Sequence, residues 1–204
     1  MSASNVRTLQ RNVKDEIQNI DYWIRANKLS FNCNKTSYII LNRPKGDTAI
    51  FNISINSQQI CEKNDIRYLS IILDNKLSWK PHIAKLTTQI FKSCGILSIL
   101  RHYTTPPVLK AVYNALIHPY LNYAVLNWAR ASKTTIQPLE NLQNKAVKFL
   151  KTSNKATLGE IYIKDNILTI NNLFKMSAGK FMHSYENNQL PSHFNQYLDR
   201  KSVV

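Results

Sequence analysis

Apolar residues in the first part of the chain recur at steps of three and four positions. Between residues 6 and 27 they are Val6, Leu9, Val13, Ile17, Ile20 and Ile24. This spacing is typical of an amphipathic helix, because residues three and four apart share one helical face. We expect Trp23 to anchor the end of this helix in the core.

The spacing then changes to a strand-like pattern. Residues 37–41 form a short β-type run, residues 49–55 alternate between apolar and polar, and residues 66–73 are rich in Ile, Leu and Tyr. A turn cluster at 42–47, which contains one Pro and one Gly, separates the first two runs. The three runs predict a small, largely antiparallel sheet.

After Asp74 the pattern returns to a helical period. Ser78 is expected to cap the first of these helices, with Pro81 in its first turn. The apolar stripe of this helix is formed by Ile83, Leu86, Ile90, Cys94 and Leu97. Lys85 and Lys92 lie seven residues apart on the opposite face, so both are expected to point into solvent.

Prolines separate the later helices. A Pro pair at 106–107 restarts the chain, and residues 109–128 predict an apolar helix that is bent or interrupted at Pro119. Residues 136–149 predict a further helix, and residues 161–185 predict one or two more.

These patterns together predict an α+β fold. An N-terminal helix and a small antiparallel sheet come first, and a mostly helical bundle follows. We place the division at the change of period, which gives one domain at 1–76 and a second at 77–204.

The charge of the chain is its strongest bulk property. Among 204 residues there are 27 Lys and Arg against 12 Asp and Glu, for a formal net charge of +15. A surface this basic attracts polyanions, with nucleic acid first and an anionic membrane surface second.

The cysteine content and the apolar runs bear on the compartment. The three cysteines, Cys33, Cys61 and Cys94, are widely spaced and form no zinc pattern, so we interpret them as small buried residues in a reducing compartment. No uninterrupted apolar run approaches the ~18 residues of a membrane span. We therefore expect an intracellular protein, nuclear or cytoplasmic, with no membrane partner.

The ionisable residues offer no catalytic pattern. Two-metal nucleotidyl transfer needs carboxylates that hold two ions about 4 Å apart, and the sequence contains no Asp-Asp pair. The five histidines are isolated, and no Gly-rich phosphate loop occurs. On residue chemistry alone the chain is a binding module that needs no cofactor of its own.

Four groups of residues, in order, resemble one protein family. The groups are WIRANKLSFNCNKT at 23–36; IRYLSIILD at 66–74 with LSWKPHI at 77–83; LIHPYLNY at 116–123 with Trp128 and LENLQNKAV at 139–147; and KFMHSY at 180–185 with LP at 190–191. They resemble the jockey-like reverse transcriptases (RNA-directed DNA polymerases) of non-LTR retrotransposons, and the resemblance covers nearly the whole chain.

The resemblance implies the last part of the palm, the thumb and a C-terminal extension. In this family the two catalytic aspartates, usually in Phe-Ala-Asp-Asp, precede the helix that corresponds to the one with Trp23. Mg²⁺ is then expected only for the complete polymerase, and this chain alone is expected to be inactive. An upstream polymerase fragment could complement it.

Lys35 lies where the family has its late palm lysine. In the family this residue is proposed to protonate the leaving pyrophosphate or to steady the nucleotide phosphates, which suits a cation beside departing negative charge. The alternative is a solvated lysine at the start of a strand. We favour the alternative, because the chain has no active site for Lys35 to serve.

Tyr68, Leu69 and Ser70 lie where the family has Tyr-Leu-Gly, the primer grip, so the resemblance implies a hairpin with a strand turn at these residues. The usual glycine lets the backbone approach the primer end closely, and Ser70 departs from it. The alternative is an ordinary edge strand with Tyr68 packed in the core.

A thumb holds the template–primer duplex mainly through its phosphates. The cations expected to contact these phosphates are Arg67, Lys80, Lys85, Lys92, Arg101, Lys145, Lys148 and Lys151. The alternative for any one lysine is a solvated helix face, while arginine can also fork onto two phosphate oxygens.

The sequence therefore predicts a reverse-transcriptase fragment that binds RNA, DNA or an RNA–DNA hybrid without polymerising nucleotides. A different class of function stays open. The chain could be a protein-interaction module, in which an apolar surface left by the missing palm meets a partner. It could also be a decayed copy without a function. Salt distinguishes the two binding functions, because phosphate binding weakens steeply with salt and an apolar interface does not.

Overall fold

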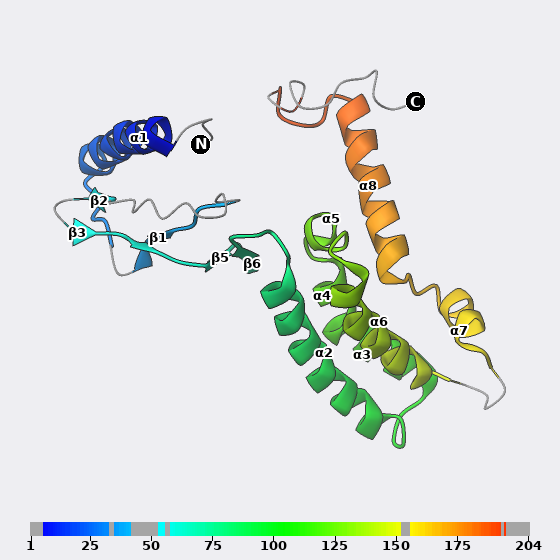
Figure 1. The fold of residues 1–204 in the computed structure, drawn as a ribbon. Coiled ribbons are helices and arrows are strands. Elements are labelled where there is room, and N and C mark those ends of the chain that lie inside the picture. Colours follow the sequence, from blue (N-terminus) through cyan, green and yellow to red (C-terminus); the bar gives the residue numbers. More distant parts are fainter. Residues whose placement is uncertain are drawn as a thin grey trace. The chain divides into compact units, whose positions relative to one another are not determined.

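The computed structural model of the chain describes residues 6–32, 35–41, 53–55, 58–151, 156–192 and 194. The chain divides into two compact units, Met1–Pro81 and His82–Val204 (Figure 1). The predicted turn at 42–47, the first part of the alternating run at 49–55, and Cys33 lie outside the described residues.

The first unit begins with helix α1, Val6–Ala26, as the apolar spacing predicted. None of the side chains described between residues 8 and 26 is buried. Trp23 is 59% exposed, so its predicted role as a core anchor is wrong. Periodicity identifies an apolar face, but burial of that face depends on what packs against it.

The described strands are short and form three separate two-stranded ladders. One ladder is parallel, and the other two are antiparallel. The single antiparallel sheet expected from the sequence is therefore divided in the described part of the chain. The strands are β1 Ser37–Tyr38, β2 Ser54–Ile55, β3 Gln58–Gln59, β4 Cys61–Glu62, β5 Asp65–Tyr68 and β6 Ile71–Asp74, paired β1–β4, β2–β3 and β5–β6.

Helices make up the described chain from residue 80 onwards, in agreement with the predicted bundle. In the second unit α3 packs on α4, α6 on α7, and α8 on α4 and α5 (Figure 1). The helices are α2 Lys80–Leu100, α3 Pro106–Leu116, α4 His118–Asn122, α5 Val125–Trp128, α6 Lys133–Lys148, α7 Leu158–Lys164 and α8 Ile170–Glu186.

The helix predicted at 109–128 is interrupted twice. The first break falls at Ile117, two residues before Pro119. The second falls at Ala124, whose φ of 52° lies in the left-handed region and cannot continue a right-handed helix. Proline predicted the first break, whereas no residue type at Ala124 signals the second.

The core of the second unit contains the stripe predicted for α2. All five of its residues are buried. Among the described helices, α2 is also long and apolar enough to cross a membrane, a property that core helices share. The buried stripe accounts for only part of this apolar content, because α2 exposes further apolar residues on its other side.

The cysteine expectation holds for one of the two described cysteines. Cys94 is buried, and its thiol points to the carbonyl oxygen of Leu142 at 3.7 Å. Burial raises the pKa of this thiol, so it stays protonated as a small apolar residue. Cys61 is exposed, which corrects the expectation that it is buried.

A buried histidine begins the core of the second unit. His82 is 2% exposed, and its ring lies 6.3 Å from that of Trp128. Burial lowers the pKa of His82, and the positive charge of Lys85 lowers it further. Folding therefore favours the neutral imidazole.

Stability is expected to fall as the pH drops below about 6.5, the usual pKa of histidine, because unfolded His82 then binds a proton that folded His82 resists. Thermal unfolding at about pH 7.5 and pH 5.5 measures the effect. In His82→Gln, which does not titrate, the difference between the two midpoints should shrink. An equal difference in both proteins would show that another group controls this range.

Candidate nucleic-acid interface

The β5–β6 hairpin contains the residues expected for a primer grip. Tyr68 pairs with Ile71, which leaves Leu69 and Ser70 as a two-residue loop. Their φ angles are 44° and 67°, and a type I′ turn requires positive φ at both positions. The single strand that the residue pattern predicted at 66–73 is therefore wrong, since neither Asn nor Gly signals a turn there. The strand turn that the family resemblance implied at Tyr68, Leu69 and Ser70 is present.

The tip of this hairpin points into solvent. Tyr68 is 61% exposed, which excludes the alternative that its ring packs in the core, and Leu69 and Ser70 are exposed as well. The guanidinium of Arg67 donates a hydrogen bond to the hydroxyl of Ser70 at 3.4 Å. Ser70 adopts the left-handed conformation that glycine takes without strain, so the serine is compatible with a tight turn.

Asp74 shapes the connection from the hairpin to α2. Its carboxylate accepts hydrogen bonds from the backbone N–H groups of Ser78 and Trp79, each at 2.9 Å. Burial raises the pKa of Asp74, but these hydrogen bonds outweigh it and hold the pKa below its usual value. Ser78 lies two residues before the helix, where its hydroxyl accepts a hydrogen bond from the N–H of Lys80 at 3.4 Å.

The four predicted cations of α2 and its C-terminal end differ in exposure. Lys80, Lys92 and Arg101 are exposed, as expected. Lys85, whose charge acts on His82, is half-buried, which corrects the expectation that its side chain is fully solvated. Lys92 is therefore the better test of this helix.

Lys145 and Lys148 are exposed on α6, and Lys151 is exposed just after it. Two cation–π contacts join α6 to α2. The Nζ of Lys145 lies 6.0 Å from the centre of the Phe91 ring. The guanidinium carbon of Arg101 lies 5.2 Å from the centre of the Phe149 ring. The structure thus brings cations from two predicted groups onto neighbouring helices.

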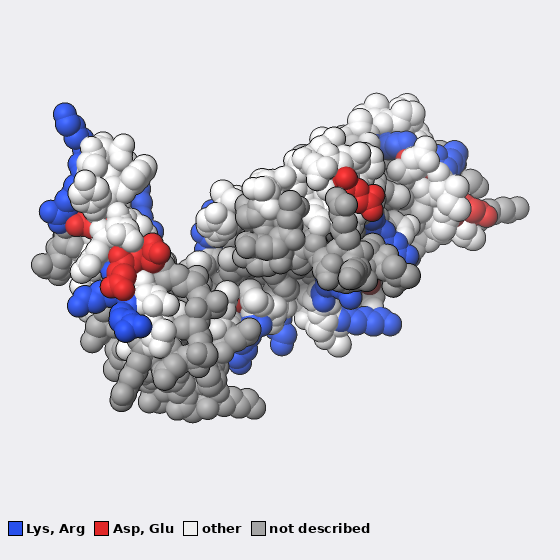
Figure 2. Space-filling model, turned by 90° about the horizontal axis from the view of Figure 1, so that it is seen from above, with Lys and Arg blue, Asp and Glu red and all other residues white. Residues whose placement is uncertain are grey.

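We use the name α2–α6 basic face for four exposed cations on these two helices and at the C-terminal end of α2, namely Lys92, Arg101, Lys145 and Lys148. Glu140 is the one acidic residue in the sequence between Lys80 and Lys151, so little negative charge offsets the positive charge of this face. Figure 2 shows Lys and Arg recurring over the face in view, with Asp and Glu in few places.

The remaining predicted residue, Lys35, is exposed two residues before β1. Its backbone N–H donates to the side-chain oxygen of Asn32 at 3.2 Å. This environment matches the alternative of a solvated lysine at the start of a strand.

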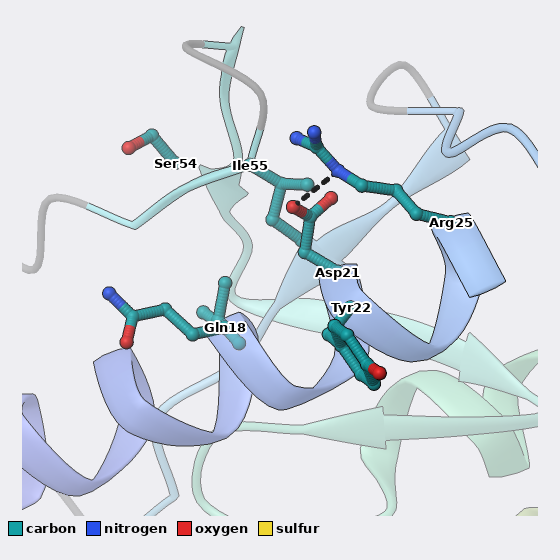
Figure 3. A pocket seen from close by; sticks show the side chains of 7 residues that line it. Gln18, Asp21, Tyr22, Arg25, Ser54 and Ile55 are labelled. Carbon is teal, nitrogen blue, oxygen red and sulfur yellow. Dashed lines mark ion pairs between the residues drawn. The ribbon is translucent and has the colours of Figure 1, made fainter.

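A separate cavity of about 400 Å³ lies between α1 and β2 (Figure 3). Asp21 and Arg25 line it and form an ion pair at 2.8 Å. The second carboxylate oxygen of Asp21 is buried, with no hydrogen-bond partner among the described residues. None of the cations predicted to bind nucleic acid lines this cavity.

Among the described residues, no three His, Cys, Asp or Glu side chains come together to hold a metal ion. No family model, curated protein or solved structure matches the chain. The resemblance to reverse transcriptases therefore rests on the sequence motifs.

The apolar residues on the exposed side of α2 were not among the residues predicted to be functional. Phe91, Ile96 and Ile99 are all largely exposed, although their neighbours in the stripe are buried. The sequence signal for a functional surface was that these residues lie off the main apolar stripe, because a solvated helix face seldom contains three large apolar residues.

Proposed function

We propose that this chain binds template–primer nucleic acid as the late palm, thumb and C-terminal extension of a non-LTR retrotransposon reverse transcriptase. The four motif groups, in the order of that family, support the identity. The α2–α6 basic face supports the binding. It is the observation on which the proposal depends, because it groups exposed cations from neighbouring helices that are distant in the sequence.

Binding at this face is electrostatic. Lysine ammonium groups on helices reach phosphate oxygens and release condensed counterions, without distinguishing one base from another. Arg101 can in addition present two parallel N–H groups to one phosphate. The face therefore positions a duplex and gives little sequence preference.

Affinity for an RNA–DNA hybrid is expected to fall with salt. If about four to six phosphates are contacted, the slope of log affinity against log salt is roughly −4 to −5. The double variant Lys92→Ala/Lys148→Ala should make this slope shallower by about 2, with no change in sequence preference. Fluorescence anisotropy over a salt series measures both.

Lys175→Ala/Lys180→Ala is the matched control, because it removes the same charge from exposed positions of α8. Its slope should equal that of the wild type. Equal slopes for the two double variants would place the contacts elsewhere, and wild-type binding that does not depend on salt would contradict the proposed function.

A second candidate function is a protein-interaction module centred on α1. Ile20, Tyr22 and Trp23 are exposed large apolar residues on a helix with no buried side chain among those described. Ile20 and Trp23 lie three residues apart and share one helix face, and exposed apolar surface of this kind marks interaction sites. Binding of a protein partner that persists at high salt would favour this function.

A further inference from the structure

The exposed side of α2 contains a row of three residues separated by one helical turn each. Phe91, Gly95 and Ile99 follow each other at intervals of four, so they lie one above another on the helix. Phe91 is 61% exposed and Ile99 is 64% exposed. The outer two side chains therefore project into solvent on either side of a glycine.

Gly95 leaves a notch between these two side chains. A Cβ atom at Gly95 would meet nothing within 4 Å, the side chains of Phe91 and Ile99 included. The eight steps from Phe91 to Ile99 span about 12 Å of helix at a rise of ~1.5 Å per residue. This length accommodates planar groups that stack about 3.4 Å apart.

Cations border the notch. Lys92 follows Phe91 directly in the helix and is exposed, and Lys145 approaches the Phe91 ring from α6. The ligand that fits therefore combines flat apolar surfaces with negative charge. Unpaired nucleotides have both, because their bases stack on aromatic rings while their phosphates meet cations.

We propose that the notch between Phe91 and Ile99 binds unpaired nucleotides, by stacking a base on Phe91 over the bare backbone of Gly95. This inference rests on the proposed function and specifies a second substrate class for the same face. Duplex bases are already stacked and paired, so the notch selects single-stranded segments, while the lysines contact the phosphates of either form.

Gly95→Leu provides the sharpest test. Leucine fills the notch without a steric clash and is a better helix former than glycine, so the variant is expected to stay folded. Its affinity for oligo(dT) of about 20 nucleotides should fall about 10-fold, the effect of losing one stacked base. Its affinity for an RNA–DNA hybrid should change less than about twofold.

Gly179→Leu is the matched control, because Gly179 is also an exposed helical glycine with open space around its Cβ position. This variant should bind oligo(dT) like the wild type. Phe91→Ala removes the stacking surface and should lose oligo(dT) affinity as Gly95→Leu does. Circular dichroism confirms that each variant is folded.

The outcomes separate the two proposals. Unchanged oligo(dT) affinity in Gly95→Leu and Phe91→Ala, with salt-dependent hybrid binding intact, overturns the notch alone. Wild-type protein that binds neither nucleic acid overturns the proposed function as well. Vesicles of phosphatidylserine and phosphatidylcholine test whether this side of α2 binds a membrane surface instead. The leucine of Gly95→Leu would strengthen insertion into a membrane. Tighter vesicle binding by Gly95→Leu with unchanged oligo(dT) affinity therefore overturns the notch.

Discussion

Trp128→Ala is expected to lower the free energy of unfolding by about 3–5 kcal/mol. Trp128 is fully buried, at 0% exposure, and its indole N–H donates a hydrogen bond to the carbonyl oxygen of Tyr123 at 3.0 Å. The substitution removes a large apolar side chain, leaves a cavity and deprives that carbonyl of its partner. The loss is a large fraction of the stability of a typical domain, which is about 5–15 kcal/mol.

Chemical denaturation followed by circular dichroism measures this loss. Trp23→Ala is the control, because it removes the same side chain from a position that is 59% exposed. It should change stability by less than about 0.5 kcal/mol. Similar losses in the two variants would contradict the assignment of Trp128 to the core.

Gln143→Leu is expected to cost about 2–4 kcal/mol, because it leaves two buried polar groups without their donor. The Gln143 side chain is 1% exposed and donates hydrogen bonds to the hydroxyl of Tyr113 at 3.1 Å and to the carbonyl oxygen of Leu168 at 2.8 Å. It thereby ties α6 to α3 and to the segment before α8. Burial raises the pKa of Tyr113 to about 12, despite the hydrogen bond from Gln143, so the hydroxyl stays neutral at physiological pH.

A double-mutant cycle with Tyr113→Phe isolates the interaction between these two side chains. Removing both partners should cost less than the sum of the single substitutions, since the unsatisfied hydroxyl is then gone. Gln137→Leu is the control on the same helix, where the exposed side chain bonds only Asn141 among the described residues. Additive costs in the cycle would contradict the proposed role of Gln143.

Much of the helical fold follows from local patterns. The apolar stripe of α2 is the buried face of that helix, and Pro119 marks the interruption near Ile117. The hairpin at Leu69 and Ser70 could not be predicted in this way. Its turn uses two residues that seldom adopt positive φ, so the sequence contains no turn signal.

The candidate site was predictable in its residues and not in its arrangement. Lys92, Lys145 and Lys148 are exposed, as residues on polar helix faces are expected to be. Their assembly depends on α2 and α6 lying side by side, which the contact between Phe91 and Lys145 establishes. Lys85 has the same helical position as Lys92 one heptad earlier, yet it is half-buried, and its charge acts on the buried His82.

The sequence by itself determined the net positive charge, the helical and strand-like periods, and the apolar face of each helix. These properties depend on residue type and on spacing of a few residues, so they need no partner element. Only the tertiary structure decided that Trp23 is exposed while Trp128 is buried, and that Phe91 stays in solvent. The physical reason is that burial is a property of pairs of surfaces. An apolar side chain leaves water only where another element covers it, and segments distant in the sequence supply that cover.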